Sequence, residues 1–154
     1  MIEKYGLCIL SDKYFQDFPY TELMQNKLES RPYFLAIREE NGIIWLVPLS
    51  SQTEKYKAAI AKVEKQRGAG GDIYHYVCKV KGKESAFLIG NTIPVTEEYI
   101  LRPFTVNGIP YVIKNKADIK EIRTRLAKFL ALVRQKKIRP YVDIMEMERK
   151  LLHS

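Results

Sequence analysis

Residues 33–50 read YFLAIREENGIIWLVPLS, and this stretch decides the fold of the chain. Two apolar runs, Tyr33–Arg38 and Ile43–Leu49, flank the polar segment Glu39-Glu40-Asn41-Gly42. An Asn-Gly pair between apolar runs is the strongest short-range signal for a β-hairpin, because both residues readily adopt the positive φ of a tight turn. The stretch therefore predicts two antiparallel strands with a short connection.

Further short elements continue from this hairpin in both directions. The spacing of apolar residues and the positions of Gly, Pro and capping residues predict them. The predicted strands are Tyr5–Leu10, Ile73–Val80, Ser85–Ile89, Ile93–Val95 and Ile100–Leu101, with turns over Lys81–Glu84 and Val106–Ile109. The predicted helices are Asp12–Asp17, Thr21–Leu28, Glu54–Gln66, a basic helix capped by Asn115, and Tyr141–Leu152.

This order of elements predicts an α+β fold. We expect a twisted antiparallel sheet, or a small SH3-like barrel, with helices around it. The 154 residues suffice for one hydrophobic core, and the run Gly68–Gly71 is too short and too closely flanked by apolar segments to separate two domains. We therefore expect a single domain over residues 1–154, with a mobile loop at the glycines.

Positive charge is concentrated in the last third of the chain. The formal net charge is +8. Residues 101–154 contain 13 basic and 5 acidic side chains, whereas residues 1–50 contain 5 and 7. A basic surface favours a polyanionic partner, because each phosphate that a basic side chain neutralises releases condensed counterions.

The region after Asn115 predicts a helix with basic edges. Apolar residues recur at three- and four-residue steps from Ile119 to Val133, and basic residues border that apolar face on both sides. Two interpretations stay open, a solvated amphipathic helix or a surface that follows an RNA backbone. The candidate RNA-binding residues are Lys13, Lys114, Lys116, Lys120, Arg123 and Arg134.

Several function classes lack their sequence signals here. The longest apolar run, Ile43–Leu49, is far shorter than a membrane span, and Met1–Tyr5 lacks the pattern of a secretory signal. Cys8 and Cys78 lie in apolar, strand-like segments, so we expect free buried thiols and a reducing cytoplasm. No nucleotide-binding glycine motif, hydrolase motif or zinc-type Cys/His spacing is present. We therefore expect no metal and no cofactor.

An ordered set of short motifs runs through most of the chain. Ser11-Asp12-Lys13-Tyr14 follows the first strand, Arg31-Pro32-Tyr33-Phe34 opens the hairpin, and Pro48-Leu49-Ser50-Ser51 ends it. Ile93-Pro94 lies in mid-chain, and two helices close the sequence. In this order and spacing the motifs resemble the toxins of type III toxin–antitoxin systems, the ToxN/AbiQ group, and within it the CptN branch most closely.

The resemblance implies both an activity and partners. Toxins of this group have a fold similar to the MazF/Kid endoribonucleases and cut RNA without a metal. In these toxins the ribose 2′-OH attacks the neighbouring phosphate, and one product ends in a 2′,3′-cyclic phosphate. The implied partners are the substrate RNA and a pseudoknotted antitoxin RNA that holds several toxin copies inactive in one assembly.

The resemblance also implies the candidate catalytic residues. Matched motif by motif, they are Tyr14, Arg31, Ser50 and Ser51. The family lysine two residues after the serine is Thr53 here, so its replacement, Lys55 or Lys57, stays open.

Cleavage by 2′-OH attack needs a base, an acid and donors to the phosphate oxygens. Arg31 suits a bidentate phosphate clamp, and Ser51 suits a positioning donor better than a nucleophile, because no Asp-His partner is evident. His75 has the natural pKa for proton exchange. Each residue also has a structural interpretation: Ser50-Ser51 as a helix cap, Tyr14 as core, Arg31 as a strand-edge charge, and His75 as a structural residue.

Three functions compete at this stage. The first is a metal-independent endoribonuclease toxin silenced by a cognate RNA. The second is a non-catalytic RNA-binding module with an SH3-like barrel, which would bind RNA and leave it intact. The third is a protein-interaction domain, whose affinity for RNA would vanish at physiological salt.

Overall fold

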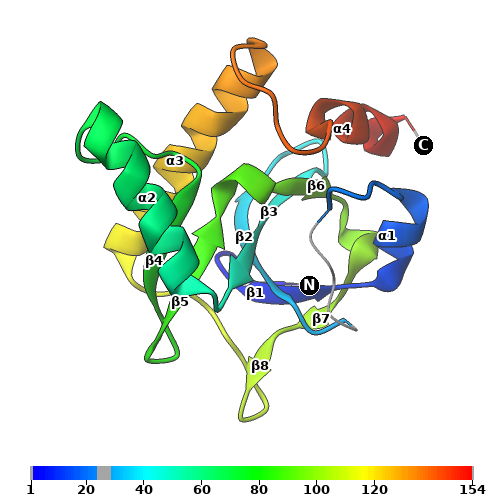
Figure 1. The fold of residues 1–154 in the computed structure, drawn as a ribbon. Coiled ribbons are helices and arrows are strands. Elements are labelled where there is room, and N and C mark those ends of the chain that lie inside the picture. The colour runs from blue at the N-terminus through cyan, green and yellow to red at the C-terminus, as the bar shows by residue number, and fades with distance from the viewer. Residues whose placement is uncertain (1, 24–28, 154) are drawn as a thin grey trace.

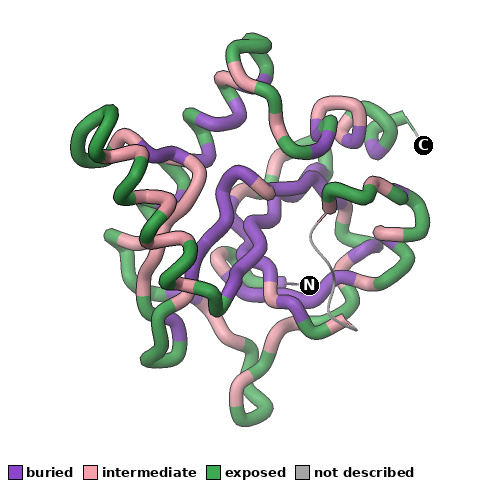
Figure 2. Tube along the Cα trace, viewed as in Figure 1, coloured by how far each residue is buried: buried purple, intermediate pink, exposed green. Residues whose placement is uncertain are grey.

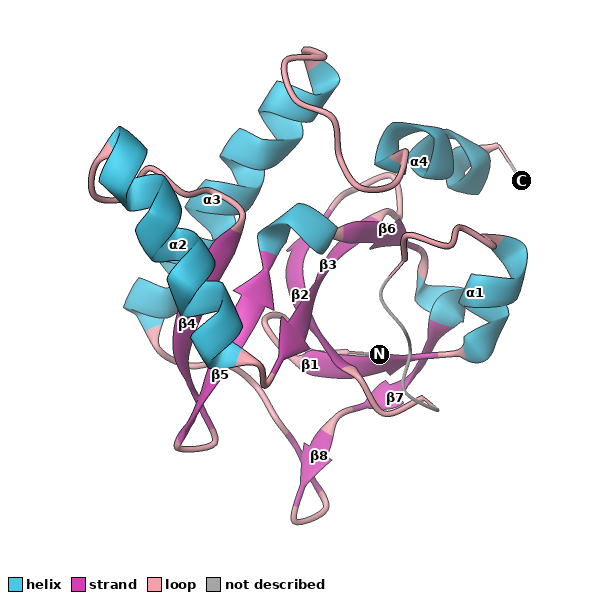
Figure 3. Ribbon diagram, in the orientation of Figure 1, coloured by secondary structure: helices cyan, strands magenta, loops and turns pink. Residues whose placement is uncertain are grey.

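Antiparallel strands curl around a common core, and helices cover the outside of the curl (Figure 1; Figure 3). The computed structural model describes residues 2–23 and 29–153. The principal strands are β1 (Leu7–Leu10), β2 (Pro32–Arg38), β3 (Ile44–Ser50), β4 (His75–Val80), β5 (Lys83–Leu88), β6 (Ile93–Val95) and β7 (Ile100–Pro103). They form one sheet in the order β4-β5-β3-β2-β1-β7, with β6 also paired to β3. The predicted α+β class with a twisted antiparallel sheet is confirmed.

The remaining elements are short turns and the helices. Two 3-10 turns, η1 (Ile89–Asn91) and η2 (Glu97–Tyr99), flank β6, and β8 (Thr105–Val106) pairs with β9 (Ile109–Pro110). The helices are α1 (Asp12–Asp17), α2 (Thr53–Arg67), α3 (Lys116–Arg134) and α4 (Ile144–Leu152). The predicted helix Thr21–Leu28 falls mostly on residues 24–28, outside the described residues, and residues 21–23 form a turn and bend.

Strand β3 is the centre of the sheet. It forms the predicted hairpin with β2, in which Asn41 Oδ1 accepts a hydrogen bond of 3.0 Å from Ile43 N. Its first half pairs with β6 and its last two residues pair with β5, so β3 has partners on both sides. All seven residues of β3 are buried. Full burial explains why the strand reads as a continuous apolar run without alternation.

The helices differ in how deeply they pack. Helix α3 buries a continuous stripe from Ile122 to Val133, and Asn115 caps it by accepting bonds from Ala117 N and Asp118 N, as the sequence predicts. Helix α2 has no fully buried residue, so it packs less deeply than α3. Helix α4 begins at Ile144, later than the predicted Tyr141, because Asp143 caps it through a 3.1 Å bond from Glu146 N.

The core lies inside the curl of the sheet, where buried segments gather (Figure 2). Phe34 and Phe87 meet edge to face with 5.6 Å between ring centroids, and Trp45 is 1% exposed. Cys8 is buried, Cys78 is half-buried, and both thiols are free. No helix in the described part of the chain combines the length and apolar character that crossing a bilayer requires.

Candidate active site

A groove of about 270 Å³ opens where β3 ends. Its walls come from the start of β2, the end of β3 and the β4–β5 hairpin, with parts of β1 and the segment after β7. The lining residues are Leu7, Ser30, Arg31, Pro32, Leu49, Ser50, Ser51, Val80, Lys81, Lys83, Glu84, Ser85 and Phe104. The groove therefore combines cations, hydroxyls and one aromatic ring in a small space.

Arg31 is fixed in the wall of this groove. Arg31 is 6% exposed, and its Nη1 donates a 2.7 Å hydrogen bond to the carbonyl oxygen of Leu49, next to Ser50. The bond joins the start of β2 to the end of β3 and so holds a guanidinium beside the two serines. A guanidinium held in one place matches the geometry of a phosphate better than a mobile lysine does. The strand-edge interpretation of Arg31 as an exposed charge is wrong.

The two serines have different environments. Ser50 is 8% exposed, and its Oγ accepts a 3.2 Å hydrogen bond from Gln52 N, so it shapes the turn into α2. Ser51 is exposed in the groove, and only its carbonyl oxygen is engaged, by Thr53 N at 2.8 Å. Ser50 therefore bonds the turn that precedes α2 but does not cap the helix, because the N-cap is Gln52 and α2 has no side-chain capping bond. The Ser51 hydroxyl has no hydrogen-bond partner within residues 2–23 and 29–153. Ser51 is therefore an exposed hydroxyl in the lining of the groove.

The first turns of α2 carry Thr53, Lys55 and Lys57, and none of these side chains lines the groove. The Nζ of Lys55 lies 5.3 Å from the ring centroid of Tyr56, on the outer side of the helix. The Nζ of Lys57 lies 2.6 Å from Glu84 Oε1, at the rim of the groove. The hydrogen bond to Glu84 raises the pKa of Lys57, which keeps it protonated. Lys57 is the lysine connected to the groove, as a cation and not as a base.

The β4–β5 hairpin brings polar groove residues that were not among the predicted site residues, namely Lys81, Lys83, Glu84 and Ser85. Lys81 and Gly82 both have positive φ, 57° and 77°, so the turn is tight and sets the two lysines close to each other. The Nζ of Lys81 lies 4.8 Å from the ring centroid of Phe104, across the groove. The run Lys79-Val80-Lys81-Gly82-Lys83 was the signal in the sequence, because it places three lysines at one hairpin turn.

Tyr14 lies in the core and not in the groove. It has no exposed surface, and its hydroxyl donates a 2.7 Å hydrogen bond to the carbonyl oxygen of Pro94. Its ring packs at 5.0 Å from Phe18 and 5.2 Å from Tyr99. Burial raises the pKa of Tyr14 well above its ordinary value, so it remains protonated. The structural interpretation holds, and a catalytic role for Tyr14 has no geometric support.

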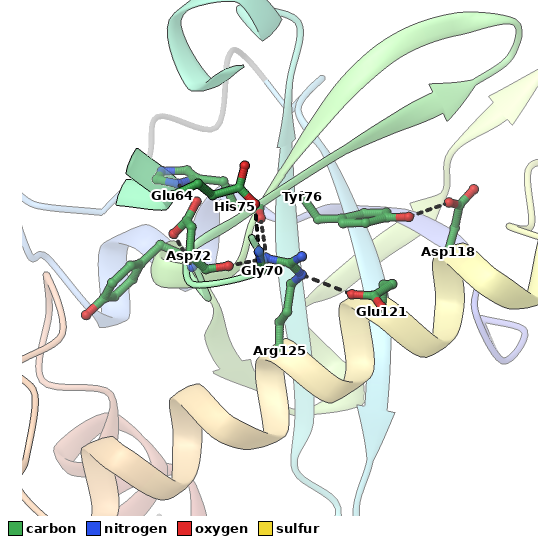
Figure 4. A network of polar contacts seen from close by, with 9 residues as sticks. Glu64, Gly70, Asp72, His75, Tyr76, Asp118, Glu121 and Arg125 are labelled. Atoms are coloured by element: carbon green, nitrogen blue, oxygen red, sulfur yellow. Dashed lines mark hydrogen bonds and ion pairs between the residues drawn. The ribbon is translucent and has the colours of Figure 1, made fainter. Parts of the chain in front are cut away.

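His75 belongs to a separate polar network between α2, β4 and α3 (Figure 4). Its Nδ1 lies 2.9 Å from Oδ2 of Asp72, whose side chain is fully buried, and its ring lies 5.3 Å from Tyr56. Arg125 of α3 donates to the carbonyl oxygens of Asp72 and His75. His75 does not line the groove, so its structural interpretation is the better one.

The charge of Asp72 is the centre of this network. Burial opposes its ionisation, but hydrogen bonds from His75 and from Tyr74 N, with the nearby charge of Arg125, outweigh burial and hold its pKa below the ordinary value. A lowered pKa means that Asp72 stabilises the fold at pH values above the unfolded pKa of about 3.9, and that this stabilisation is lost as pH falls through the folded pKa.

We expect Asp72→Asn to lower the free energy of unfolding at pH 7 by about 1–3 kcal/mol, the cost of removing a charged hydrogen-bond partner. The gap between wild type and variant should shrink as the pH is taken below about 4. Urea unfolding at pH 7, 5 and 3 measures both values. Glu40→Gln, in an exposed turn, is the matched control and should change little at any pH. A gap that stays constant at pH 3 would contradict the charged role of Asp72.

A second basic surface lies on α3, and we call Lys116, Lys120 and Arg123 with Tyr5 the α3 basic face. They surround a shallow hollow of about 330 Å³. Arg123 Nη1 donates a 3.1 Å bond to the Tyr5 hydroxyl, and its guanidinium lies 5.6 Å from the ring centroid. Three of the residues predicted to bind RNA are thus close neighbours.

The other three predicted RNA-binding residues lie elsewhere. Lys114 lines a different hollow, with Lys79. Lys13 pairs with Asp17 at 2.9 Å, and Arg134 makes two 3.0 Å hydrogen bonds to the carboxylate of Glu148. The charges of Lys13 and Arg134 are therefore compensated within the fold, and neither belongs to the α3 basic face.

Residues 2–23 and 29–153 contain no group of three or more His, Cys, Asp or Glu side chains arranged to hold a metal ion. The chemistry available in the groove is that of its arginine, lysines, serines and the Glu84 carboxylate.

Comparison with known proteins adds one finding to this geometry. No protein-family model matches the chain, and no curated protein matches it in sequence. Among solved structures, the chain is similar to AbiQ, a lactococcal anti-phage endoribonuclease belonging to the type III toxin–antitoxin system. The two share 14% sequence identity with a TM-score of 0.63, and the match covers 90% of this chain and 88% of AbiQ. Nearly the whole chain therefore has the fold of a known endoribonuclease toxin.

Proposed function

We propose that this protein is an endoribonuclease toxin of the ToxN/AbiQ group that cuts RNA in the groove at the end of β3. The observation that carries the proposal is the convergence of Arg31, Ser51 and the two lysines of the β4–β5 turn on one groove. The AbiQ-like fold and the ordered sequence motifs support the same function. Assignment to the CptN branch remains a prediction from the motifs.

In the proposed reaction the ribose 2′-oxygen attacks the neighbouring phosphorus and displaces the 5′-oxygen of the next nucleotide. Arg31 holds the phosphate, and Ser51 donates to an oxygen on which negative charge accumulates. Lys81 and Lys83 neutralise flanking phosphates. Within the described lining, Glu84 is the only carboxylate, and it is the proposed acceptor of the 2′-OH proton. The departing 5′-oxygen takes a proton from solvent water. The products are a 2′,3′-cyclic phosphate and a 5′-hydroxyl, and no step requires a metal.

The α3 basic face is the proposed contact for RNA backbone, including that of an inhibitory antitoxin RNA. Lys116, Lys120 and Arg123 supply the charge, and each is exposed. A pseudoknotted antitoxin, a multi-copy toxin–RNA assembly and action in the cytoplasm follow from the family resemblance and remain proposals.

Incubating the purified protein with RNA in EDTA tests the activity, with mass spectrometry of the product ends. We expect fragments that end in 2′,3′-cyclic phosphate. Ser51→Ala should reduce the cleavage rate about 10²- to 10³-fold, as removal of one preorganised donor to a charged transition state does. RNA that is bound but stays intact would favour the non-catalytic RNA-binding module.

Tyr14→Phe tests, in the same assay, a motif residue that lies outside the groove. It removes a hydroxyl from the core and leaves the groove untouched, so cleavage per folded molecule should match wild type while the melting temperature falls. A folded Tyr14→Phe protein that has lost activity would restore the catalytic role implied by the motif and overturn its assignment to the core.

A further inference from the structure

The connection between α3 and α4 forms a large hollow, which we call the α3–α4 hollow. It encloses about 1090 Å³ and is lined by residues 133–134, 136–143 and 145. In Figure 1 this connection lies at the opposite end of the molecule from the β4–β5 turn, which borders the groove. The α3–α4 hollow is therefore a site distinct from the groove.

Three cations of the α3–α4 hollow are available to a ligand. Lys136, Lys137 and Arg139 are exposed, and none of them forms an ion pair with a described residue. The acidic groups nearby are already engaged, since Glu148 pairs with Arg134 and Asp143 caps α4. The hollow thus presents a concave surface with excess positive charge.

The backbone at Lys136 adds a second observation. Lys136 has φ 59°, and hydrogen bonds from Lys136 N to Val133 O (3.0 Å) and from Lys137 N to Leu132 O (2.9 Å) close the end of α3. This pattern is the Schellman motif, in which glycine is strongly favoured at the left-handed position. A lysine there costs stability that glycine would not, and such a residue is a reason to look for a function of its side chain.

An aromatic ring lies among these cations. Tyr141 is 61% exposed and lines the hollow. One edge of the ring is seated against Gly90, where a β-carbon would lie 3.4 Å from Tyr141 Cε2. The ring is thus positioned by the fold while most of its surface faces solvent, which is the arrangement of a stacking platform.

We propose that the α3–α4 hollow binds a single-stranded segment of RNA, separately from the groove. One unpaired base stacks on Tyr141, and Lys136, Lys137 and Arg139 contact successive phosphates. The strand must be single, because a base in a duplex already has its faces covered by its neighbours. This inference goes beyond the proposed function, because it concerns binding and holds whether or not the groove cuts RNA.

A 12-nucleotide RNA with 2′-O-methyl groups is the probe, because it cannot be cleaved by 2′-OH attack. Its affinity is measured by fluorescence anisotropy at several salt concentrations. Tyr141→Ala should weaken binding on the order of tenfold, and Tyr141→Phe should not. Lys136→Gln, Lys137→Gln and Arg139→Gln together should reduce the slope of log affinity against log salt by about 2, at roughly 0.7 per phosphate contact in a single strand.

The matched control is a triple variant on α2 that removes two lysines and one arginine from exposed positions outside the hollow: Lys62→Gln, Lys65→Gln and Arg67→Gln. Lys136→Gly separates loss of binding from loss of folding. It should raise the melting temperature, because glycine is favoured at this left-handed position, and it should still weaken RNA binding. The proposal is overturned if the hollow and control triple variants lose RNA affinity equally, or if no hollow variant changes the affinity. It is also overturned if a duplex probe binds as tightly as the single strand. Wild type that binds the probe without cutting ordinary RNA would refute the proposed function alone.

Discussion

Replacing Arg31 by glutamine is expected to reduce the rate of RNA cleavage about 10²- to 10³-fold, an effect on activity as large as that of Ser51→Ala. The guanidinium is buried in the groove wall and held by Leu49 O at 2.7 Å, so the substitution removes the proposed phosphate clamp. Arg31→Lys should recover only a small part of the rate, since an ammonium cannot bind a phosphate bidentately. Single-turnover cleavage in EDTA measures all three proteins.

The control for this experiment must remove an arginine outside the groove. Arg149→Gln does so on α4, where the side chain is 62% exposed and paired with Glu146. Its cleavage rate should equal that of wild type. Because Arg31→Gln also removes a hydrogen bond between two strands, its melting curve must be recorded, and the rate compared at a temperature where the variant is fully folded. A folded Arg31→Gln protein with the wild-type rate would exclude the groove as the active site.

The largest predicted effect on stability is that of Phe129→Ala. Phe129 is 1% exposed in the buried stripe of α3, and its ring packs edge to face on Tyr74 with 6.0 Å between centroids. Removing a ring of this size from a packed core costs about 3–5 kcal/mol, a large share of the 5–15 kcal/mol of a typical domain. In a chain of this length the melting temperature should fall on the order of 10 °C.

Ile109→Ala is the matched control for the loss of a large apolar side chain. Ile109 is 68% exposed in β9, so its removal should change the free energy of unfolding by less than about 0.5 kcal/mol. Urea denaturation followed by circular dichroism compares the two. If the two substitutions destabilise equally, the burial of α3 against the sheet is wrong.

The elements that were predictable from the sequence are those fixed by neighbouring residues. The β2–β3 hairpin was predicted because Asn41-Gly42 specifies its turn locally, and α3 because its cap and its apolar stripe lie within one segment. The predicted start of α4 at Tyr141 was three residues early, because the spacing of apolar residues does not show which residue caps the helix. Asp143 decides it.

The site was predictable only in part, for a related reason. Ser51 and Arg31 came from motifs, whereas the pairing of β5 with the end of β3 joins Leu49 to Phe87 and Ser50 to Ala86, residues far apart in the sequence. That non-local pairing brings Lys81 and Lys83 to the groove, and no local pattern encodes it. Tyr14 shows the converse case. A motif placed it in the site, and only the packing of β6 beside α1 makes clear that its hydroxyl has a structural partner in Pro94.

The position of β3 links the proposed catalytic groove to the folding of the sheet. This strand hydrogen-bonds to β2, β5 and β6, so it cannot detach without separating the sheet on both of its sides. Strands of this kind open only when the entire cooperative unit unfolds. The Leu49 carbonyl that anchors Arg31, together with Ser50, belongs to that unit. A nascent or partly unfolded chain therefore lacks the proposed catalytic groove, and the proposed toxicity would arise in one step, when the domain is complete.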